Sequence, residues 1–278
     1  MARRRKKTEI SLVKVALVFL AAALVIGIGT AVYFLRALEQ AEPNEPNKAT
    51  APTASRNDYD ADAFEMRDGF LRYQDAPYMV GVDVSTHQGL IDWQAVADAG
   101  VEFAILRAGY RGSTEGKLYE DEQFRENLTG ARAAGLKIGV YFFSQALTPE
   151  EAEEEAAFVC RLLDGETLDL PVFFDWEEVS GGTRVESAAA VPMTDCSIAF
   201  CEEVERKGYT AGVYFNQTYG YLHLELERLQ GYTLWLAEYG DTPSFRFHFD
   251  CLQYTDSGTV NGIEGSVDLD LLIMGSSE

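Results

Sequence analysis

The sequence predicts an α/β protein, an irregular TIM-like (β/α)5(β)3 barrel preceded by one N-terminal transmembrane helix. Two observations lead to this fold class. From residue 79 onward, short apolar and β-branched runs alternate with stretches of helical spacing, a pattern typical of parallel βαβ units buried on both faces. Before them, an uncharged run of 21 residues follows a basic N-terminus, as expected of a helix that spans a bilayer.

The N-terminal segment has the composition of a membrane anchor. Residues 1–14 carry six basic residues and one acid, and residues 15–35 (VALVFLAAALVIGIGTAVYFL) carry no charge. A helix of that length spans roughly 30 Å, the thickness of the hydrocarbon core of a bilayer. The alternative is a cleaved signal peptide, whose apolar region is usually about 7–15 residues long and ends in a small-residue cleavage site. This run is longer and ends in YFLR, which favours the anchor.

Four segments are therefore expected: a basic cytoplasmic segment (1–14), a transmembrane anchor (15–36), an extracytoplasmic linker (37–77) and a barrel (78–275). Because basic residues stay on the cytoplasmic side, we expect a single-pass protein of the cell membrane with its barrel outside. The linker contains several prolines and little periodic hydrophobicity, which is typical of an extended tether.

The charge and the cysteines exclude some classes of function. Residues 15–278 carry 17 basic and 44 acidic residues, so the body repels phosphates and we expect no nucleic-acid binding. The cysteines have neither CxxC nor metal-ligand spacing, and they form either an extracytoplasmic disulfide or buried free thiols: Cys160, Cys196, Cys201 and Cys251. The three histidines are scattered, so we expect no metal and no other cofactor. Nothing indicates an oligomeric state.

Eight strands are expected in the barrel, at residues 79–85, 103–109, 137–145, 171–177, 210–216, 233–239, 248–256 and 266–273. A helical stretch follows each of the first five strands, and the last three follow one another through short connections. The helix after the third strand has a clear start, because Thr148, Pro149 and Glu151 combine a capping-box spacing with proline in the first turn.

Four acidic residues are placed near the rim of this barrel: Asp83 in the first strand, Asp175 and Glu177 at the end of the fourth, and Asp268 in the last. Active sites of such barrels lie at the C-terminal ends of the strands. Side chains two residues apart on a strand share a face, so Asp175 and Glu177 point together while Trp176 and Glu178 point away. Crowded carboxylates raise each other's pKa, which can keep one of them protonated as a general acid.

A protonated carboxyl beside a carboxylate is the arrangement that cleaves glycosidic bonds. A site for a hard cation is the rival use of four acids. Aromatic residues near the strand ends can stack on sugars and favour carbohydrate: Tyr110, Tyr141, Phe143, Tyr214, Trp235, Tyr239 and Tyr254.

Seven stretches then occur in the order seen in glycoside hydrolase family 25: GVDVSTHQG (81–89), FAILRAGYRG (103–112), GVYFFSQA (139–146), PVFFDWE (171–177), LWLAEY (234–239), LQYTDSG (252–258) and SVDLD (266–270). From Met79 to Met274 the sequence therefore resembles this family of Chalaropsis-type lysozymes, which are N-acetylmuramidases. The resemblance implies an irregular barrel of five βα units and three further strands.

The resemblance also implies roles for the acids. Glu177 would be the general acid and Asp175 the group that stabilises the transition state. Asp83 and Asp268 would orient the sugar or water and adjust the protonation of the pair. Two further acids match no catalytic position and are expected as rim or surface charges: Glu178 and Asp270.

The expected substrate-binding set consists of the seven aromatic residues named above together with Gln253 of the QY pair. Two departures from the family pattern concern this set. Leu252 stands where members often have Trp, and Phe142 and Phe143 stand where they often have Tyr or His. Both departures concern saccharide subsites and leave the four acids in place.

The implied activity is hydrolysis of the β-1,4 bond between N-acetylmuramic acid and N-acetylglucosamine in peptidoglycan. The 2-acetamido group of muramic acid favours a substrate-assisted route. The implied partners are the glycan strands of peptidoglycan and the bacterial membrane. Two alternatives stay open, a non-catalytic wall-binding module on the same barrel and a glycosidase of another amino-sugar polymer such as chitin. The presence of all four acids argues against the first, and the absence of a DxxDxDxE stretch argues against the second.

Cell fractionation tests the anchor. We expect the full-length protein to stay in the membrane fraction after a high-salt wash, because salt screens charged contacts but does not release an apolar helix. Protease should reach the C-terminal domain only from outside. Recovery of a mature protein starting near Ala41 in the medium would show a cleaved signal instead.

Overall fold

The computed structural model describes residues 53–187 and 190–275. The predicted basic segment, the predicted anchor at 15–36 and the first part of the predicted linker lie outside these residues. Within the described ranges, no helix combines the length and the apolar composition needed to cross a membrane. The anchor therefore stays a prediction.

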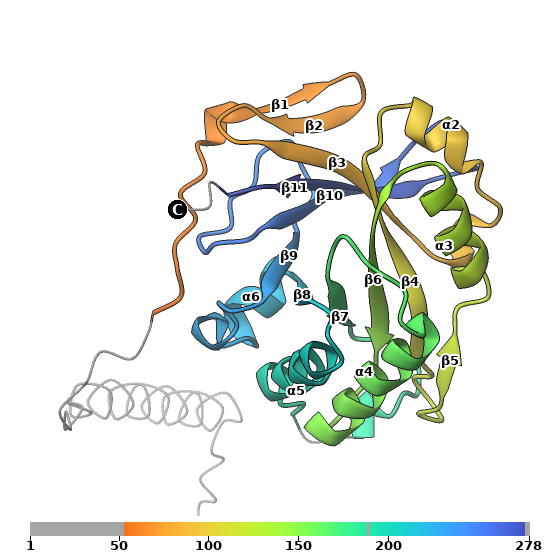
Figure 1. The fold of residues 1–278 in the computed structure, drawn as a ribbon. Coiled ribbons are helices and arrows are strands. Elements are labelled where there is room, and N and C mark those ends of the chain that lie inside the picture. Colours follow the sequence, from red (N-terminus) through yellow and green to blue (C-terminus); the bar gives the residue numbers. More distant parts are fainter. Residues whose placement is uncertain (1–52, 188–189, 276–278) are drawn as a thin grey trace, which may run out of the picture. The chain divides into compact units, whose positions relative to one another are not determined.

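Eight strands form a closed barrel (Figure 1). Their bounds are β3 (Tyr78–Val84), β4 (Phe103–Arg111), β6 (Lys137–Ser144), β7 (Val172–Trp176), β8 (Ala211–Asn216), β9 (Thr233–Ala237), β10 (Cys251–Gly258) and β11 (Val267–Ile273). Neighbouring strands from β3 to β10 are parallel. The last strand, β11, closes the ring and is antiparallel to both β10 and β3. The predicted eight-stranded α/β barrel is confirmed.

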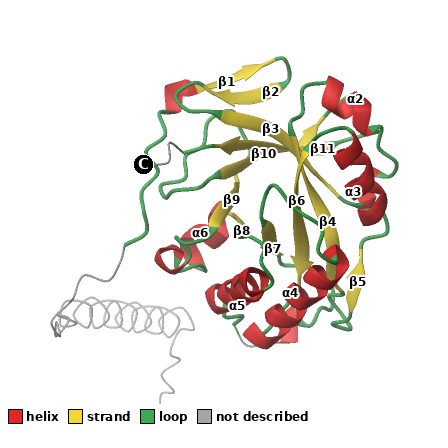
Figure 2. Cartoon of the chain, in the orientation of Figure 1, coloured by secondary structure: helices red, strands yellow, loops and turns green. Residues whose placement is uncertain are grey.

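Helices lie on the outside of this barrel (Figure 2). They are α2 (Trp93–Asp98), α3 (Phe124–Ala133), α4 (Pro149–Leu163), α5 (Met193–Arg206) and α6 (Gln217–Leu222). Helix α4 starts as predicted, with the Thr148 side chain accepting a hydrogen bond from the Glu151 amide. In detail the chain departs from a plain (β/α)5(β)3 order, because a short strand, β5 (Leu118–Glu120), is inserted after β4 and pairs antiparallel with it.

Large aromatic rings fill the inside of the barrel. Phe103, Phe173 and Trp235 are buried there, and the rings of Phe173 and Trp235 meet edge to face with centroids 5.1 Å apart. Glycine makes room for such rings, since a Cβ on Gly81 would lie 2.3 Å from the Phe103 ring. On β7, Asp175 follows Phe173 on the same face. Its carboxyl therefore lies above this aromatic layer, toward the C-terminal end of the barrel.

The second half of the predicted linker is folded, which corrects that prediction. Strands β1 (Phe64–Arg67) and β2 (Phe70–Tyr73) form an antiparallel hairpin. Its two turn residues, Asp68 and Gly69, have φ angles of 54° and 84°, as a type I′ hairpin turn requires. The hairpin is fixed to the barrel because Leu71 is fully buried and its amide donates a hydrogen bond to the Tyr254 hydroxyl (3.2 Å).

The two alternatives for the cysteines are also resolved. All four lie within the described residues, are buried and are free thiols. They are packed as small apolar side chains. This burial raises their pKa above the usual thiol value.

Candidate active site

A cleft of about 350 Å³ opens at the C-terminal ends of the barrel strands. All four predicted acids line it, and so do six of the eight predicted substrate-binding residues: Tyr141, Phe143, Tyr214, Trp235, Tyr239 and Gln253. These residues come from strands that are far apart in the sequence, and closure of the barrel brings them together.

Strand β7 supplies one pair of acids. Asp175 is buried in the strand, and Glu177, half-buried, follows its last residue. As predicted, Trp176 points to the other side, where its indole nitrogen donates a hydrogen bond to the Ala146 carbonyl (2.9 Å). Burial and then the charge of Glu177 raise the pKa of Asp175 well above its usual value, against the opposing effect of Arg107. Burial also raises the pKa of Glu177.

The other pair of acids lies across the seam that closes the barrel. Asp83 on β3 and Asp268 on β11 are direct cross-strand partners. Burial, then Asp256, then Glu177 raise the pKa of Asp268 to about 6. Asp83 is buried, and the pKa of its carboxyl lies well above the usual value for the same main reason.

Gln253 connects two tyrosines to Asp83. Its side-chain oxygen accepts hydrogen bonds from the hydroxyls of Tyr214 (3.0 Å) and Tyr239 (3.3 Å). Its side-chain nitrogen donates to Asp83 Oδ2 at 2.8 Å. The tyrosines therefore fix the orientation of the amide, and the amide holds the Asp83 carboxylate. Gln253 was predicted to bind substrate, and in the structure its hydrogen bonds orient an acid.

Asp270 differs from the expectation of a rim or surface charge. It is fully buried below the cleft, where Oδ1 accepts a hydrogen bond from the Trp235 indole nitrogen (2.9 Å). Burial raises its pKa well above the usual value, and its charge is one of the causes that raise the pKa of Asp83. Glu178, by contrast, is exposed as expected.

Arg107 is a cleft residue that the sequence reasoning missed. Of the described residues that line the cleft, it is the one arginine or lysine. Its Nε donates to Asp121 Oδ2 at 2.7 Å, and Asp121 Oδ2 also accepts from the Thr86 amide. The signal was present, since Arg107 follows Phe103 and Ile105 at the strand period that places side chains on the inner face.

A short 3₁₀ helix after β3 was missed as well. It spans Thr86–Gln88, and Ser85 and Gln88 form a capping box at its start. Ser85, His87 and Gln88 line the cleft, and all three belong to the stretch GVDVSTHQG that also contains Asp83.

Two predicted binding residues lie outside the cleft. Tyr110 stacks on Tyr119 with ring centroids 5.3 Å apart, and Tyr254 is buried under the hairpin. The three residues that depart from the family pattern differ in location. Leu252 and Phe142 are fully buried in the core. Only Phe143 borders the cleft.

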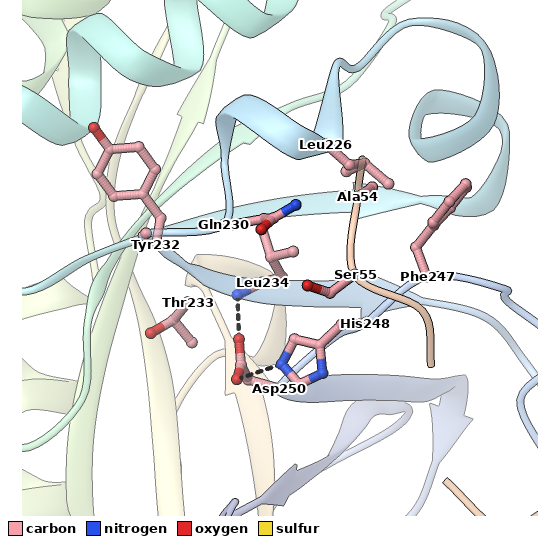
Figure 3. A pocket seen from close by; sticks show the side chains of 11 residues that line it. Ala54, Ser55, Leu226, Gln230, Tyr232, Thr233, Leu234, Phe247, His248 and Asp250 are labelled. Atoms are coloured by element: carbon pink, nitrogen blue, oxygen red, sulfur yellow. Dashed lines mark hydrogen bonds and ion pairs between the residues drawn. The ribbon is translucent and has the colours of Figure 1, made fainter. Parts of the chain in front are cut away.

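A second cavity, of about 270 Å³, lies at the opposite, N-terminal ends of β9 and β10 (Figure 3). Asp250 lies at its edge, bonding His248 at 3.1 Å and the Leu234 amide at 2.7 Å. No predicted site residue lines this cavity. Within the described parts of the chain, no group of three or more His, Cys, Asp or Glu residues is arranged to hold a metal ion. The candidate site is therefore the acidic cleft.

Comparison with known proteins gives concordant matches. The model of the Glycosyl hydrolases family 25 matches residues 82–263. An autolytic lysozyme of Clostridium acetobutylicum is 33% identical over 193 residues, which cover 69% of this chain and 55% of the relative. The chain thus spans about half the length of this curated relative.

Solved structures share the fold. The modular autolysin LytC of Streptococcus pneumoniae, in complex with a synthetic peptidoglycan ligand, superposes with a TM-score of 0.63 at 22% identity, over 75% of this chain and 52% of that one. A family 25 glycosyl hydrolase of Bacillus anthracis superposes with a TM-score of 0.60 at 22% identity, over 74% of this chain and 93% of that one.

The raised pKa of Asp268 predicts a pH-dependent stability. Its folded-state pKa of about 6 lies above the usual value of 3.8, so the folded state holds this proton more tightly than the unfolded state. The stabilisation is complete below pH 3.8 and is lost as pH rises through 6. Urea unfolding of the wild type and of Asp268→Asn should show the wild type losing free energy of unfolding, relative to the variant, over this window.

Glu178→Gln is the matched control, since it removes one exposed carboxylate that does not line the cleft. A constant difference between wild type and Asp268→Asn from pH 3.8 to pH 7 would contradict the assignment.

Proposed function

Because the chain belongs to glycosyl hydrolase family 25, we propose that it is an N-acetylmuramidase, which hydrolyses the β-1,4 bond between N-acetylmuramic acid and N-acetylglucosamine in peptidoglycan. One observation carries the proposal: Asp175 on β7 and Glu177 just beyond its last residue both line a cleft that also presents tyrosine and tryptophan rings. An acid pair beside aromatic rings suits cleavage of a sugar polymer. A relative named a lysozyme and a fold neighbour solved with a peptidoglycan ligand support the same substrate class.

In this proposal Glu177 is the general acid. It lies at the mouth of the cleft, beyond the last residue of β7, where a leaving-group oxygen can reach it. Burial raises its pKa, so it retains a proton at a higher pH than an exposed glutamate does. Donation of that proton to the glycosidic oxygen lets the bond to the anomeric carbon break.

Asp175 stabilises the positive charge that then develops. Asp175 lines the cleft, where its carboxylate can accept a bond from the acetamido N–H of muramic acid. The acetamido oxygen forms a bond to the anomeric carbon as the glycosidic bond breaks. The acetamido group and the anomeric carbon then form one ring. Water attacks the anomeric carbon, breaks its bond to the acetamido oxygen and gives a proton to Glu177, with net retention of configuration.

Asp83 and Asp268 are the two remaining acids of the cleft, and we assign them no proton transfer. Asp83, held by Gln253, lies across the seam from Asp268, and the two line the wall of the cleft together with Asp175. Beyond the effect of burial, the charge of Asp268 helps to raise the pKa of Asp83 and of Asp175. We assign them to orientation of the sugar or the water, as the family resemblance implies.

We also propose that the domain is held at the outer face of the cell membrane by residues 15–36. The support for this is the uncharged run that follows the basic cluster.

Product analysis tests the function, and one substitution tests the acid. Purified peptidoglycan treated with the full-length protein should yield fragments with N-acetylmuramic acid at the new reducing end, as read by mass spectrometry after borohydride reduction. Glu177→Gln keeps the shape of the side chain but has no proton to donate, so activity should fall by at least about two orders of magnitude.

Glu178→Gln is the matched control, because it makes the same change one residue further on, at an exposed side chain. It should leave activity near the wild-type level. Reducing-end N-acetylglucosamine would make the protein a glucosaminidase, and near-normal turnover by a folded Glu177→Gln protein would remove Glu177 from its role.

The anomer released first tests the substrate-assisted route. A ring formed by the acetamido group predicts net retention, so NMR of a soluble muropeptide oligomer should show the β-anomer immediately after cleavage. Early appearance of the α-anomer would show inversion, and Asp175 would then be a base that activates water.

A further inference from the structure

A larger cavity adjoins the reaction cleft on the side of the β1–β2 hairpin. Its volume is about 550 Å³, and it lies between the hairpin, the loop after β9 and the C-terminal part of β10 with Thr259 just beyond it. The residues that line it are Met66, Gly69, Tyr239, Gly240, Asp241, Tyr254, Thr255, Asp256, Ser257, Gly258, Thr259 and Leu269. Its hairpin wall lies outside residues 82–263, which the family model matches.

Tyr239 is shared by the two cavities. It lines both the reaction cleft and the hairpin cavity, and 56% of its surface is exposed. Its hydroxyl is bonded to Gln253, so the exposed ring is held at one end and forms a fixed wall between the cavities. An exposed, anchored aromatic ring is a suitable surface for stacking a sugar. Asp256, which lines the hairpin cavity, also raises the pKa of Asp268 in the cleft.

Strand β2 anchors the hairpin to the barrel. Phe70, Leu71 and Tyr73 of β2 are buried, and the Leu71 amide is bonded to Tyr254. Met66 on β1 stays 42% exposed at the cavity. An exposed methionine on a firmly packed hairpin offers an apolar edge to a ligand.

The polar lining selects the chemistry of the occupant. It contains the carboxylates of Asp241 and Asp256 and the hydroxyls of Thr255, Ser257 and Thr259, and none of the described residues that line it is a lysine, arginine or histidine. Carboxylates and hydroxyls accept hydrogen bonds from sugar hydroxyls and acetamido N–H groups. The same carboxylates repel the acidic groups of a stem peptide.

We infer that the hairpin cavity is an additional sugar subsite, which binds a neutral N-acetylhexosamine unit of the glycan strand next to the units held in the reaction cleft. This inference rests on the proposed function for the identity of the polymer. The hairpin, which belongs to the segment before the family domain, thereby extends the cleft and makes the enzyme prefer long strands to short ones.

Dependence on chain length tests the subsite. The full-length protein is assayed on peptide-free oligomers of alternating N-acetylglucosamine and N-acetylmuramic acid, from tetrasaccharide to octasaccharide. We expect kcat/KM to rise with length in the wild type. Met66→Gln replaces the apolar edge with a polar side chain of similar length. Its kcat/KM for the octasaccharide should be about fivefold below that of the wild type, on the scale of one lost apolar contact. Its kcat/KM for the tetrasaccharide should be unchanged.

Arg67→Gln is the matched control, since it places the same residue at the neighbouring exposed position, which does not line the cavity. It should keep the full rise. An absence of any rise in the wild type, or an equal rise in wild type and Met66→Gln, would overturn the subsite.

Failure of the proposed function is distinguishable from failure of the subsite. If no oligomer is cleaved, the muramidase assignment fails. Calorimetric binding of the same oligomers to the same three proteins then decides the subsite, with tighter binding of longer oligomers that Met66→Gln weakens as the supporting result and length-independent binding as the contrary one.

Discussion

The main constraint on this structure is that several carboxyl groups are buried close together at one end of a narrow barrel. Asp83 and Asp268 face each other across the seam between the first and last barrel strands, and Asp175 lies on the inner face of β7 above a layer of aromatic rings. Such crowding is unfavourable when all the groups are ionised. Protonation of some of the groups and a few oriented hydrogen bonds reduce this repulsion. The retained protons are also what acid catalysis requires.

The hydrogen bonds that orient these acids reach well beyond the cleft. Gln253 holds Asp83 and is itself fixed by two tyrosines. The next residue, Tyr254, points to the other side of β10 and binds the backbone of the hairpin. Adjacent residues of one strand thus tie the reaction cleft to the segment that precedes the family domain. Placement of the hairpin beside the cleft is a consequence of this packing.

Sequence periodicity predicted the strands and the four acids of the cleft, because both depend on local alternation along each strand. Other features depend on distant contacts. Asp270 looked like a surface charge, and its burial follows only from closure of β11 on β3 and from the bond to Trp235. Tyr110 and Tyr254 lie near strand ends but face away from the cleft.

Two signals were readable and were overlooked. Asp68–Gly69 between FEMR, in which apolar and charged residues alternate, and FLRY is a hairpin pattern, hidden in a segment whose proline content suggests a tether. Arg107 interrupts an apolar strand on its inner face, where a charge requires a partner such as Asp121.

The central claim is that burial keeps a proton on the Asp175–Glu177 pair at a pH where isolated carboxyl groups are ionised. Carbon-13 NMR titration of the side-chain carboxyl carbons of these two residues in the folded protein measures this directly. The account predicts that the pair takes up its first proton well above 3.8 and 4.5, the usual pKa values of aspartate and glutamate. Titration of both carboxyl groups at or below those values would contradict it.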